Sequence, residues 1–300
     1  MGVISPVIDS HQHVWDLERA HYDWLGPDFG PIDRTVTFDE LAPSLVRTGV
    51  HATVLVESAD NIEDTQVMFD TAARHRTVAA IVAYVPLDDP DEVARQLSQL
   101  TSSSLTVGVR NLIHNRADPD WLLRPEVDAG LALVEEAGLA LDVVSVLPRH
   151  LELIPILSER HPRLRMVIDH LSKPPIGLEP DHPWWGLLAD AAKNPSVHAK
   201  VSGLYGATPN EGSWTVDQVR PYFAHALQLF GPKRLMYGSD WPISITAGGY
   251  DRVWDGLNSL FSDLDAADRD EIMGATCARF YQIDPDRIRV AVDTSLSAHR

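Results

Sequence analysis

The chain has 300 residues, of which 44% are hydrophobic and 23% are charged, as in an ordinary globular protein. Its formal net charge of -18 argues against a nucleic-acid partner, because binding to phosphates requires clustered Lys and Arg. The single cysteine, Cys277, excludes an intramolecular disulfide and a metal cage of thiolates. We find neither a secretory leader nor a run of about eighteen apolar residues, so we expect a cytoplasmic protein with no membrane partner.

Short apolar runs rich in β-branched residues alternate with segments of helical periodicity, which is typical of parallel strands joined by crossover helices. Eight such runs occur, at 7–9, 52–57, 78–85, 106–110, 139–146, 164–169, 197–202 and 234–239. Eight parallel strands close a (β/α)8 barrel, and neither a polar linker nor a repeat divides the chain. The sequence therefore predicts an α/β protein in which residues 1–300 form one TIM-barrel domain.

Several helices carry start and stop signals. Residues 37–40 have the pattern of a capping box, and Gly49 follows as a stop. Thr215 is placed to begin a long helix that ends at Gly231. In the segment 151–160, Pro155 lacks a backbone donor, so we expect a kinked or shortened helix there.

Four long connections follow predicted strands one, six, seven and eight. In a parallel barrel these loops extend over the rim formed by the carboxyl ends of the strands, where catalysis takes place. They carry aromatic residues, among them Trp15, Trp24 and Trp241, and span 173–185, 205–214 and 241–250 after the last three of these strands. We expect the aromatic residues either to wall a pocket for a small molecule or to pack the loops onto the barrel.

Three histidines and one aspartate lie at predicted strand ends. His11 and His13 share one face of the first strand, because residues i and i+2 point the same way. His170 ends the sixth strand and Asp240 ends the eighth, so all four side chains should converge on the rim. Such a set suits one divalent metal ion, with zinc favoured, while Asp240 alone is also able to accept a proton from water. Both alternatives stay open, and the sequence predicts no organic cofactor.

Further candidates for substrate contact lie near other strand ends. They are Arg110, Asn111 and His114 after the fourth strand, Glu57 on the second, Tyr84 on the third and Lys200 on the seventh. A guanidinium at the rim is suited to hold a carboxylate or a hydroxyl group. The alternative is a structural ion pair, and Asp142 is one possible partner that would hold Arg110 in place.

Several motifs together resemble the amidohydrolase superfamily and, more narrowly, its lactonase branch, which includes L-fuconolactonase-like sugar lactonases and pyrone dicarboxylate lactonases. The motifs are IDSHQH at 8–13, GVR at 108–110, VIDHLSKP at 167–174, KVSGL at 200–204, LMYGSDWP at 235–242 and the segment 274–281. The resemblance implies a distorted TIM barrel with His11, His13, His170 and Asp240 in the active site. The fifth run lacks a histidine and the fourth strand offers no lysine to bridge two metals, so we expect at most one ion. The branch also includes enzymes that act without metal.

The leading hypothesis is hydrolysis of a small lactone, of a sugar acid or a related carboxylated ring. Asp240 would act as general base on water, and no Gly-x-Ser-x-Gly elbow offers a nucleophilic serine. The alternatives are a metal-dependent nonoxidative decarboxylase of an unsaturated or aromatic acid and a noncatalytic barrel. The expected partner is a small-molecule substrate, and a homo-oligomer is left open.

Overall fold

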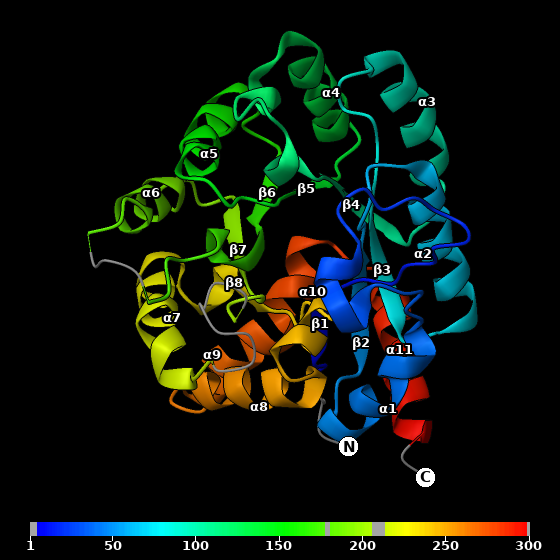
Figure 1. The fold of residues 1–300 in the computed structure, drawn as a ribbon, viewed down its shortest axis with the longest axis vertical. Coiled ribbons are helices and arrows are strands. Elements are labelled where there is room, and N and C mark those ends of the chain that lie inside the picture. Colours follow the sequence, from blue (N-terminus) through cyan, green and yellow to red (C-terminus); the bar gives the residue numbers. More distant parts are fainter. Residues whose placement is uncertain (1–4, 178–180, 206–213, 299–300) are drawn as a thin grey trace.

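The computed structural model describes residues 5–177, 181–205 and 214–298, and the chain forms a parallel barrel (Figure 1). Its strands run in the order β1 to β8, and each pairs in parallel with the next. A bridge between Gln12 and Trp241 connects the first strand to the last. The strands are β1 (Ile8–Gln12), β2 (Ala52–Val56), β3 (Val78–Ala83), β4 (Thr106–Asn111), β5 (Ala140–Val143), β6 (Arg165–Ile168), β7 (Val197–Val201) and β8 (Leu235–Tyr237). The prediction of a TIM barrel is confirmed.

Helices surround the strands on the outside of the barrel (Figure 1). The α-helices are α1 (Phe38–Thr48), α2 (Ile62–Arg74), α3 (Pro90–Leu100), α4 (Pro125–Glu136), α5 (Pro148–Arg160), α6 (Trp184–Ala191), α7 (Val216–Phe230), α8 (Tyr250–Phe261), α9 (Ala266–Asp270), α10 (Thr276–Phe280) and α11 (Pro285–Ala298). Short 3-10 segments lie at Pro27–Ile32, Ile113–Asn115, Trp121–Leu123, Asp169–Ser172, Pro232–Arg234 and Ile243–Ala247, and a π-helix at Glu271–Ala275. Within the described ranges, every helix is too short or too polar to cross a bilayer.

The predicted helix signals are confirmed, with one correction. Thr37 forms a capping box with Glu40, and Gly49 ends α1 in the left-handed conformation. Thr215 caps α7. Helix α5, however, is not shortened at Pro155, since it continues from Pro148 to Arg160. Its buried face of His150, Leu151, Leu153, Ile154 and Leu157 packs in the core, and this burial offsets the roughly 3 kcal/mol that an internal proline costs.

The amino-terminal end of the barrel is closed by the C-terminal helices. Phe280 and Tyr281 are buried together with Ile8, Val54 and other residues on β1 to β3. The backbone approaches closely here, since a Cβ added at Gly274 would lie 1.9 Å from the carbonyl oxygen of Pro6. Because side chains fill this end, a small molecule reaches the barrel interior from the rim at the carboxyl ends of the strands.

The rim loops are described in part. The loop after β1 forms an aromatic cluster in which the Trp24 ring contacts Trp15 at 5.4 Å and Phe29 at 5.1 Å between centroids. Most of the loop predicted at 205–214, and residues 178–180 of the loop after β6, lie outside the described residues.

Candidate active site

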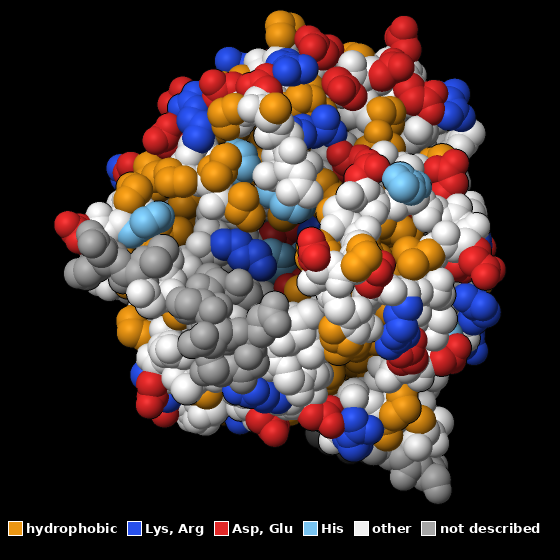
Figure 2. Space-filling model, in the orientation of Figure 1, with side chains coloured by type: hydrophobic (Ala, Val, Ile, Leu, Met, Phe, Trp, Pro, Cys, Tyr) orange, Lys and Arg blue, Asp and Glu red, His pale blue; other side chains and the backbone are white. Residues whose placement is uncertain are grey.

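A cavity of about 630 Å³ opens at the carboxyl-terminal rim of the barrel. His13, His170 and Asp240 line it together with Arg110 and His114. Figure 2 shows a hollow on this face with histidine and charged side chains around it. Its remaining lining comes from the rim loops and comprises Asp23, Trp24, Phe29, Ser58, Leu112, Asn115, Val144, Val146, Lys173 and Ile243.

Three imidazoles surround one carboxylate oxygen beside this cavity. The Nε2 atom of His13 lies 3.5 Å from Oδ1 of Asp240, and those of His11 and His170 each lie 3.8 Å from it. The histidine rings are close to one another, with centroids 4.9 Å apart for His11 and His13 and 4.5 Å apart for His11 and His170. The predicted convergence of strand ends β1, β6 and β8 therefore occurs in the fold.

The backbone around Asp240 is unusual. Asp240 has a φ of 56° and its amide donates to the carbonyl of His11 at 2.9 Å, which joins the end of β8 to β1. Gly203 also has a positive φ, and a Cβ there would lie 2.6 Å from His170 Nδ1 and 2.8 Å from Asp240 Oδ2. Glycine at this position therefore lets the chain after β7 pass directly beside the two side chains.

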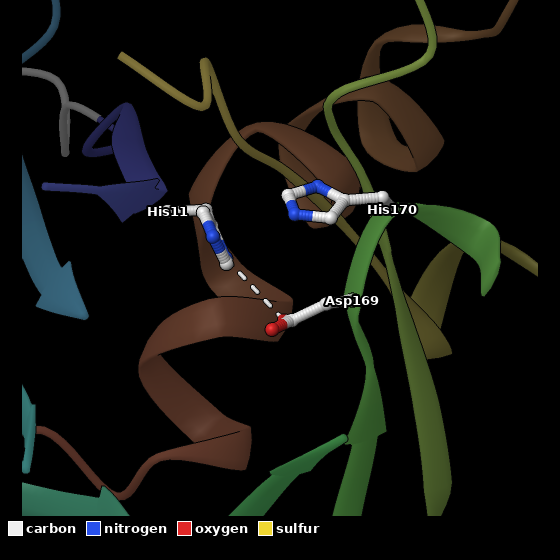
Figure 3. A group of neighbouring side chains, drawn as sticks. All are labelled: His11, Asp169 and His170. Carbon is white, nitrogen blue, oxygen red and sulfur yellow. Dashed lines mark ion pairs between the residues drawn. The ribbon is translucent and has the colours of Figure 1, made fainter. Parts of the chain in front are cut away.

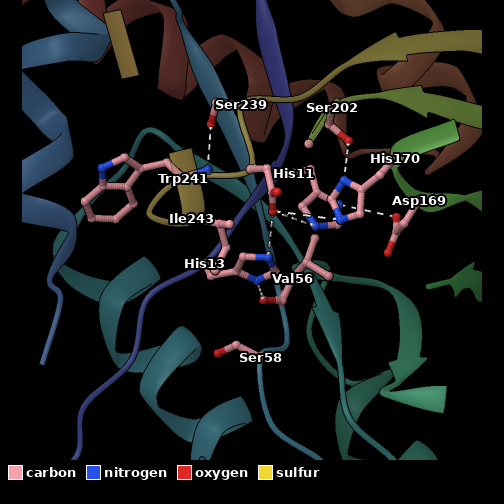
Figure 4. A network of polar contacts seen from close by, with 12 residues as sticks. His11, His13, Val56, Ser58, Asp169, His170, Ser202, Ser239, Trp241 and Ile243 are labelled. Atoms are coloured by element: carbon pink, nitrogen blue, oxygen red, sulfur yellow. Dashed lines mark hydrogen bonds and ion pairs between the residues drawn. The ribbon is translucent and has the colours of Figure 1, made fainter. Parts of the chain in front are cut away.

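The far side of each imidazole is held by another group (Figure 4). Nδ1 of His13 lies 2.8 Å from the carbonyl oxygen of Val56, and Nδ1 of His170 lies 2.8 Å from Oγ of Ser202. Because a carbonyl only accepts, the Nδ1 of His13 carries a proton, and the Nε2 of His13 is the ring atom that faces Asp240. Such outer partners are typical of histidines that bind metal.

The charge states of these groups follow from burial and from their neighbours. Burial lowers the pKa of His170 to about 3, and burial together with nearby Lys200 holds the pKa of His11 well below its usual value. Burial opposes ionisation of Asp240, but His170, His13 and Lys173 outweigh it, so its pKa lies below the usual range. At neutral pH the site therefore combines neutral His11 and His170 with an ionised carboxylate.

Residues 170–173 form a left-handed turn. His170, Leu171, Ser172 and Lys173 all have φ between 46° and 59°, a conformation that costs L-residues about 1–2 kcal/mol each. The turn is held by a hydrogen bond of 2.7 Å from Trp184 Nε1 to the Leu171 carbonyl and by a contact of 2.6 Å between Ser172 Oγ and Ser145 Oγ. It directs both His170 and Lys173 to the cavity. Strain of this kind gathers at functional sites.

A network of buried ion pairs lies below the histidines. Arg110 pairs with Glu57 at 3.1 Å and with Asp169 at 3.0 Å. Lys200 pairs with Asp142 and lies 3.1 Å from Asp169 and 2.9 Å from His11 Nδ1. Burial opposes ionisation of Asp169, but Lys200, His11 and Arg110 hold its pKa well below the usual value. The network therefore buries two cations among carboxylates immediately behind His11.

Two groups of side chains have donor atoms close enough to hold one metal ion. His11, His13 and Asp240 form one group, and His11, Asp169 and His170 form the other (Figure 3). Asp169 is an unfavourable ligand because Arg110 and Lys200 already compensate its charge and would repel a cation. The imidazole nitrogens of His11 and His13 and the ionised Asp240 suit a divalent ion of the zinc type, with His170 as a further nitrogen donor.

Comparisons with known proteins agree with this architecture. The model of the amidohydrolase family matches residues 8–283. The chain belongs to the amidohydrolase family. It is 36% identical to the L-fucono-1,5-lactonase of Burkholderia ambifaria, over 92% of this chain and 96% of that protein. It is 30% identical to the L-fucono-1,5-lactonase of Burkholderia multivorans, over 94% of this chain and 97% of that protein. This amidohydrolase is a hydrolase that resembles lactonases, as the sequence motifs predict.

Solved structures agree with the assignment of this chain to the amidohydrolase family. An amidohydrolase of Burkholderia multivorans crystallised with bound zinc is 28% identical and superposes with a TM-score of 0.85, over 93% of this chain and all of that one. The 5-carboxyvanillate decarboxylase of Sphingomonas paucimobilis has a TM-score of 0.67 at 13% identity, over 94% of this chain and all of that one. The second likeness concerns the fold alone, so the lactonase hypothesis is the better supported.

Several residues predicted to contact substrate lie outside the cavity lining. Trp15 is buried and its indole donates to the Arg34 carbonyl at 2.7 Å, while Trp241 is buried beside β1. Asn111 is buried and donates to the Val85 carbonyl at 3.0 Å. Tyr84 is half-buried without reaching the cavity. These side chains pack the rim, whereas Trp24, Arg110 and His114 do line the cavity.

The ion-pair network corrects three further expectations. Lys200 and Glu57 are fully buried and serve as partners of other charged groups instead of lining the cavity. Asp142 does not hold Arg110, because it pairs with Lys200 and accepts from the hydroxyl of Tyr281 at 2.8 Å. Arg110 reaches the cavity with its charge already compensated by Glu57 and Asp169.

Sequence reasoning missed two important residues, Asp169 and Lys173. Both lie in the VIDHLSKP motif that contains His170, and this motif is the signal that would have identified them. Asp169 was overlooked because the neighbouring His170 was already assigned to the site. Lys173 was overlooked because the sequence alone does not reveal the left-handed turn that brings it to the cavity beside His170.

Proposed function

We propose that this amidohydrolase opens an uncharged, hydroxylated sugar-acid lactone of the L-fucono-1,5-lactone type. The observation that carries the proposal is the compensated charge of Arg110, which is ion-paired with Glu57 and Asp169. A dicarboxylate ring would require several free cations facing it. Burial lowers the pKa of His114 to about 4, so this residue is neutral, and among the described lysines and arginines of the lining only Lys173 has no acidic side chain within ion-pair distance.

The wall of the cavity suits a sugar ring. Trp24 and Phe29 meet edge to face at 5.1 Å and present aromatic surface, while Asp23, Ser58 and Asn115 offer polar groups. Carbohydrates present C–H faces to aromatic rings and hydroxyls to polar side chains. A cavity of about 630 Å³ is large enough for one such ring.

The reaction begins with Asp240. Its carboxylate is ionised and accepts a proton from water as the water oxygen attacks the lactone carbonyl. When the ring C–O bond breaks, Asp240 returns the proton to the leaving alkoxide, and the new acid ionises to a carboxylate. His11, His13 and His170 are the residues that would hold a zinc ion together with Asp240. When bound there, zinc supplies Lewis acidity to the carbonyl or the water.

The test is an indicator assay of proton release with sugar-acid lactones and pyrone dicarboxylate, run with and without a chelator and paired with elemental analysis. We expect turnover of L-fucono-1,5-lactone or a close stereoisomer and none of the dicarboxylate. Release of carbon dioxide from an aromatic acid without any lactone opening would contradict the proposal.

A further inference from the structure

Lys173 lies at the cavity, but the reaction of Asp240 with water and the lactone gives it no role. It is half-buried, lines the cavity and ends the left-handed turn that begins at His170. Its amide donates to the His170 carbonyl at 2.9 Å, so the two residues are one turn apart. In a helix of three residues per turn, residues i and i+3 lie above one another, which places both side chains on the same side of the turn.

The ammonium group of Lys173 has few partners. Its Nζ donates to the Gly203 carbonyl at 3.4 Å, and no described acidic side chain lies within ion-pair distance of it. Arg110, the other cation at the cavity, is held by Glu57 and Asp169. A positive charge that is partly removed from water and lacks an acidic partner is placed to receive an anion.

Lactone opening creates such an anion. A neutral ring enters, the carbonyl oxygen becomes an oxyanion during attack, and the product leaves as a carboxylate. Asp240 is negatively charged and faces the same cavity, so it disfavours this developing charge. A second positive group near the carbonyl would offset that repulsion and would act most strongly once the charge has formed.

We propose that Lys173 contacts the substrate and stabilises the negative charge that develops on the lactone carbonyl and remains on the product carboxylate. This inference rests on the proposed lactonase function and adds a catalytic residue to it. The left-handed turn thus places two different functions at one site, with His170 near Asp240 and Lys173 toward the carbonyl oxygen.

The test compares Lys173→Gln and Lys173→Arg with the wild type. Gln keeps a donor for the Gly203 carbonyl but removes the charge, and Arg keeps the charge. For Lys173→Gln we expect kcat to fall about 10- to 100-fold and the inhibition constant of the aldonate product to rise about 10-fold or more. The KM of the neutral lactone should change far less. Lys173→Arg should recover part of kcat and of product binding.

The control is Lys193→Gln on the exposed surface, where Lys193 pairs with Asp190. Thermal unfolding and bound metal are measured for every variant, and soluble Lys173→Arg keeps the test decisive if Lys173→Gln does not fold. An unchanged product inhibition constant in Lys173→Gln, or a Lys173→Arg variant as impaired as Lys173→Gln, overturns the inference. Absence of lactone turnover in the wild type overturns the proposed function instead.

Discussion

The hydroxyl of Tyr281, in the turn that follows α10, lies 2.8 Å from each carboxylate oxygen of Asp142 on β5. Asp142 pairs with Lys200, and Lys200 lies 2.9 Å from Nδ1 of His11. A chain of buried contacts therefore links the C-terminal helices, which close one end of the barrel, to the histidines at the other end. Charges in this chain have no water to replace a lost partner, so they should be sensitive to substitution.

Lys200→Met should destabilise the fold by about 3–5 kcal/mol, because Asp142 would remain buried without its cation and Asp169 would keep only Arg110 as a partner. The double variant Lys200→Met with Asp142→Asn should recover part of this loss, since one uncompensated carboxylate is then removed. Urea unfolding at pH 7 measures both effects. A single variant as stable as the wild type would show that the ion pairs contribute no net stability.

Asp169→Asn should alter the acid sensitivity of the protein. The pKa of Asp169 is lower in the folded chain than in the unfolded chain, where it lies near 3.9. Its stabilising contribution is therefore present above about pH 4 and is lost as the pH falls through the folded pKa. We expect Asp169→Asn to be less stable than the wild type at pH 7, with a smaller difference at pH 3. The free energies of unfolding of both proteins, measured between pH 3 and pH 7, test this expectation. A stability difference that grows toward acid would contradict the lowered pKa of Asp169.

Much of this site could be predicted because parallel strands must bring their carboxyl ends to one rim. The positions of His11, His13, His170 and Asp240 follow from that rule and from strand spacing. The depth at which a side chain lies inside the barrel does not follow from this rule, because it depends on strand register and tilt. Lys200 is therefore a buried partner of Asp142, although its position on the seventh strand suggested substrate contact.

Asp240→Asn should lower kcat by about 10²- to 10⁴-fold, because an amide cannot accept the proton of water. The amide keeps the size of the carboxylate, and the backbone bond from residue 240 to the His11 carbonyl remains. Thermal unfolding should therefore show a folded protein. Rates on the best lactone near those of the wild type would refute the mechanism.

His13→Ala should impair zinc binding more than the roughly 10- to 100-fold that loss of an outer partner causes, since His13 Nε2 is itself a donor atom in the site. His225→Ala provides the control, because His225 contacts the Trp185 carbonyl at 3.1 Å away from the cavity lining. Elemental analysis after dialysis against a zinc buffer should find about one ion per chain in the control and much less in His13→Ala. Equal zinc in both proteins would place the ion elsewhere.

Gly203→Ala and Gly138→Ala separate backbone strain from damage to the site. Gly203 has a φ of 57° and Gly138 a φ of 69°, so alanine is strained similarly at both positions. Only at Gly203 does the added Cβ meet catalytic groups, namely Nδ1 of His170 at 2.6 Å and Oδ2 of Asp240 at 2.8 Å, whereas nothing lies within 4 Å at Gly138.

Both variants should lose about 1 kcal/mol or more of stability from the strained backbone. Gly203→Ala should in addition lower kcat at least 10-fold, because a displacement of His170 or Asp240 by even 1 Å disrupts the alignment of base and carbonyl. Steady-state kinetics and thermal unfolding on the two purified variants give the comparison. If the two variants lost activity equally, the close approach of Gly203 would have no catalytic meaning and the loss would stem from strain alone.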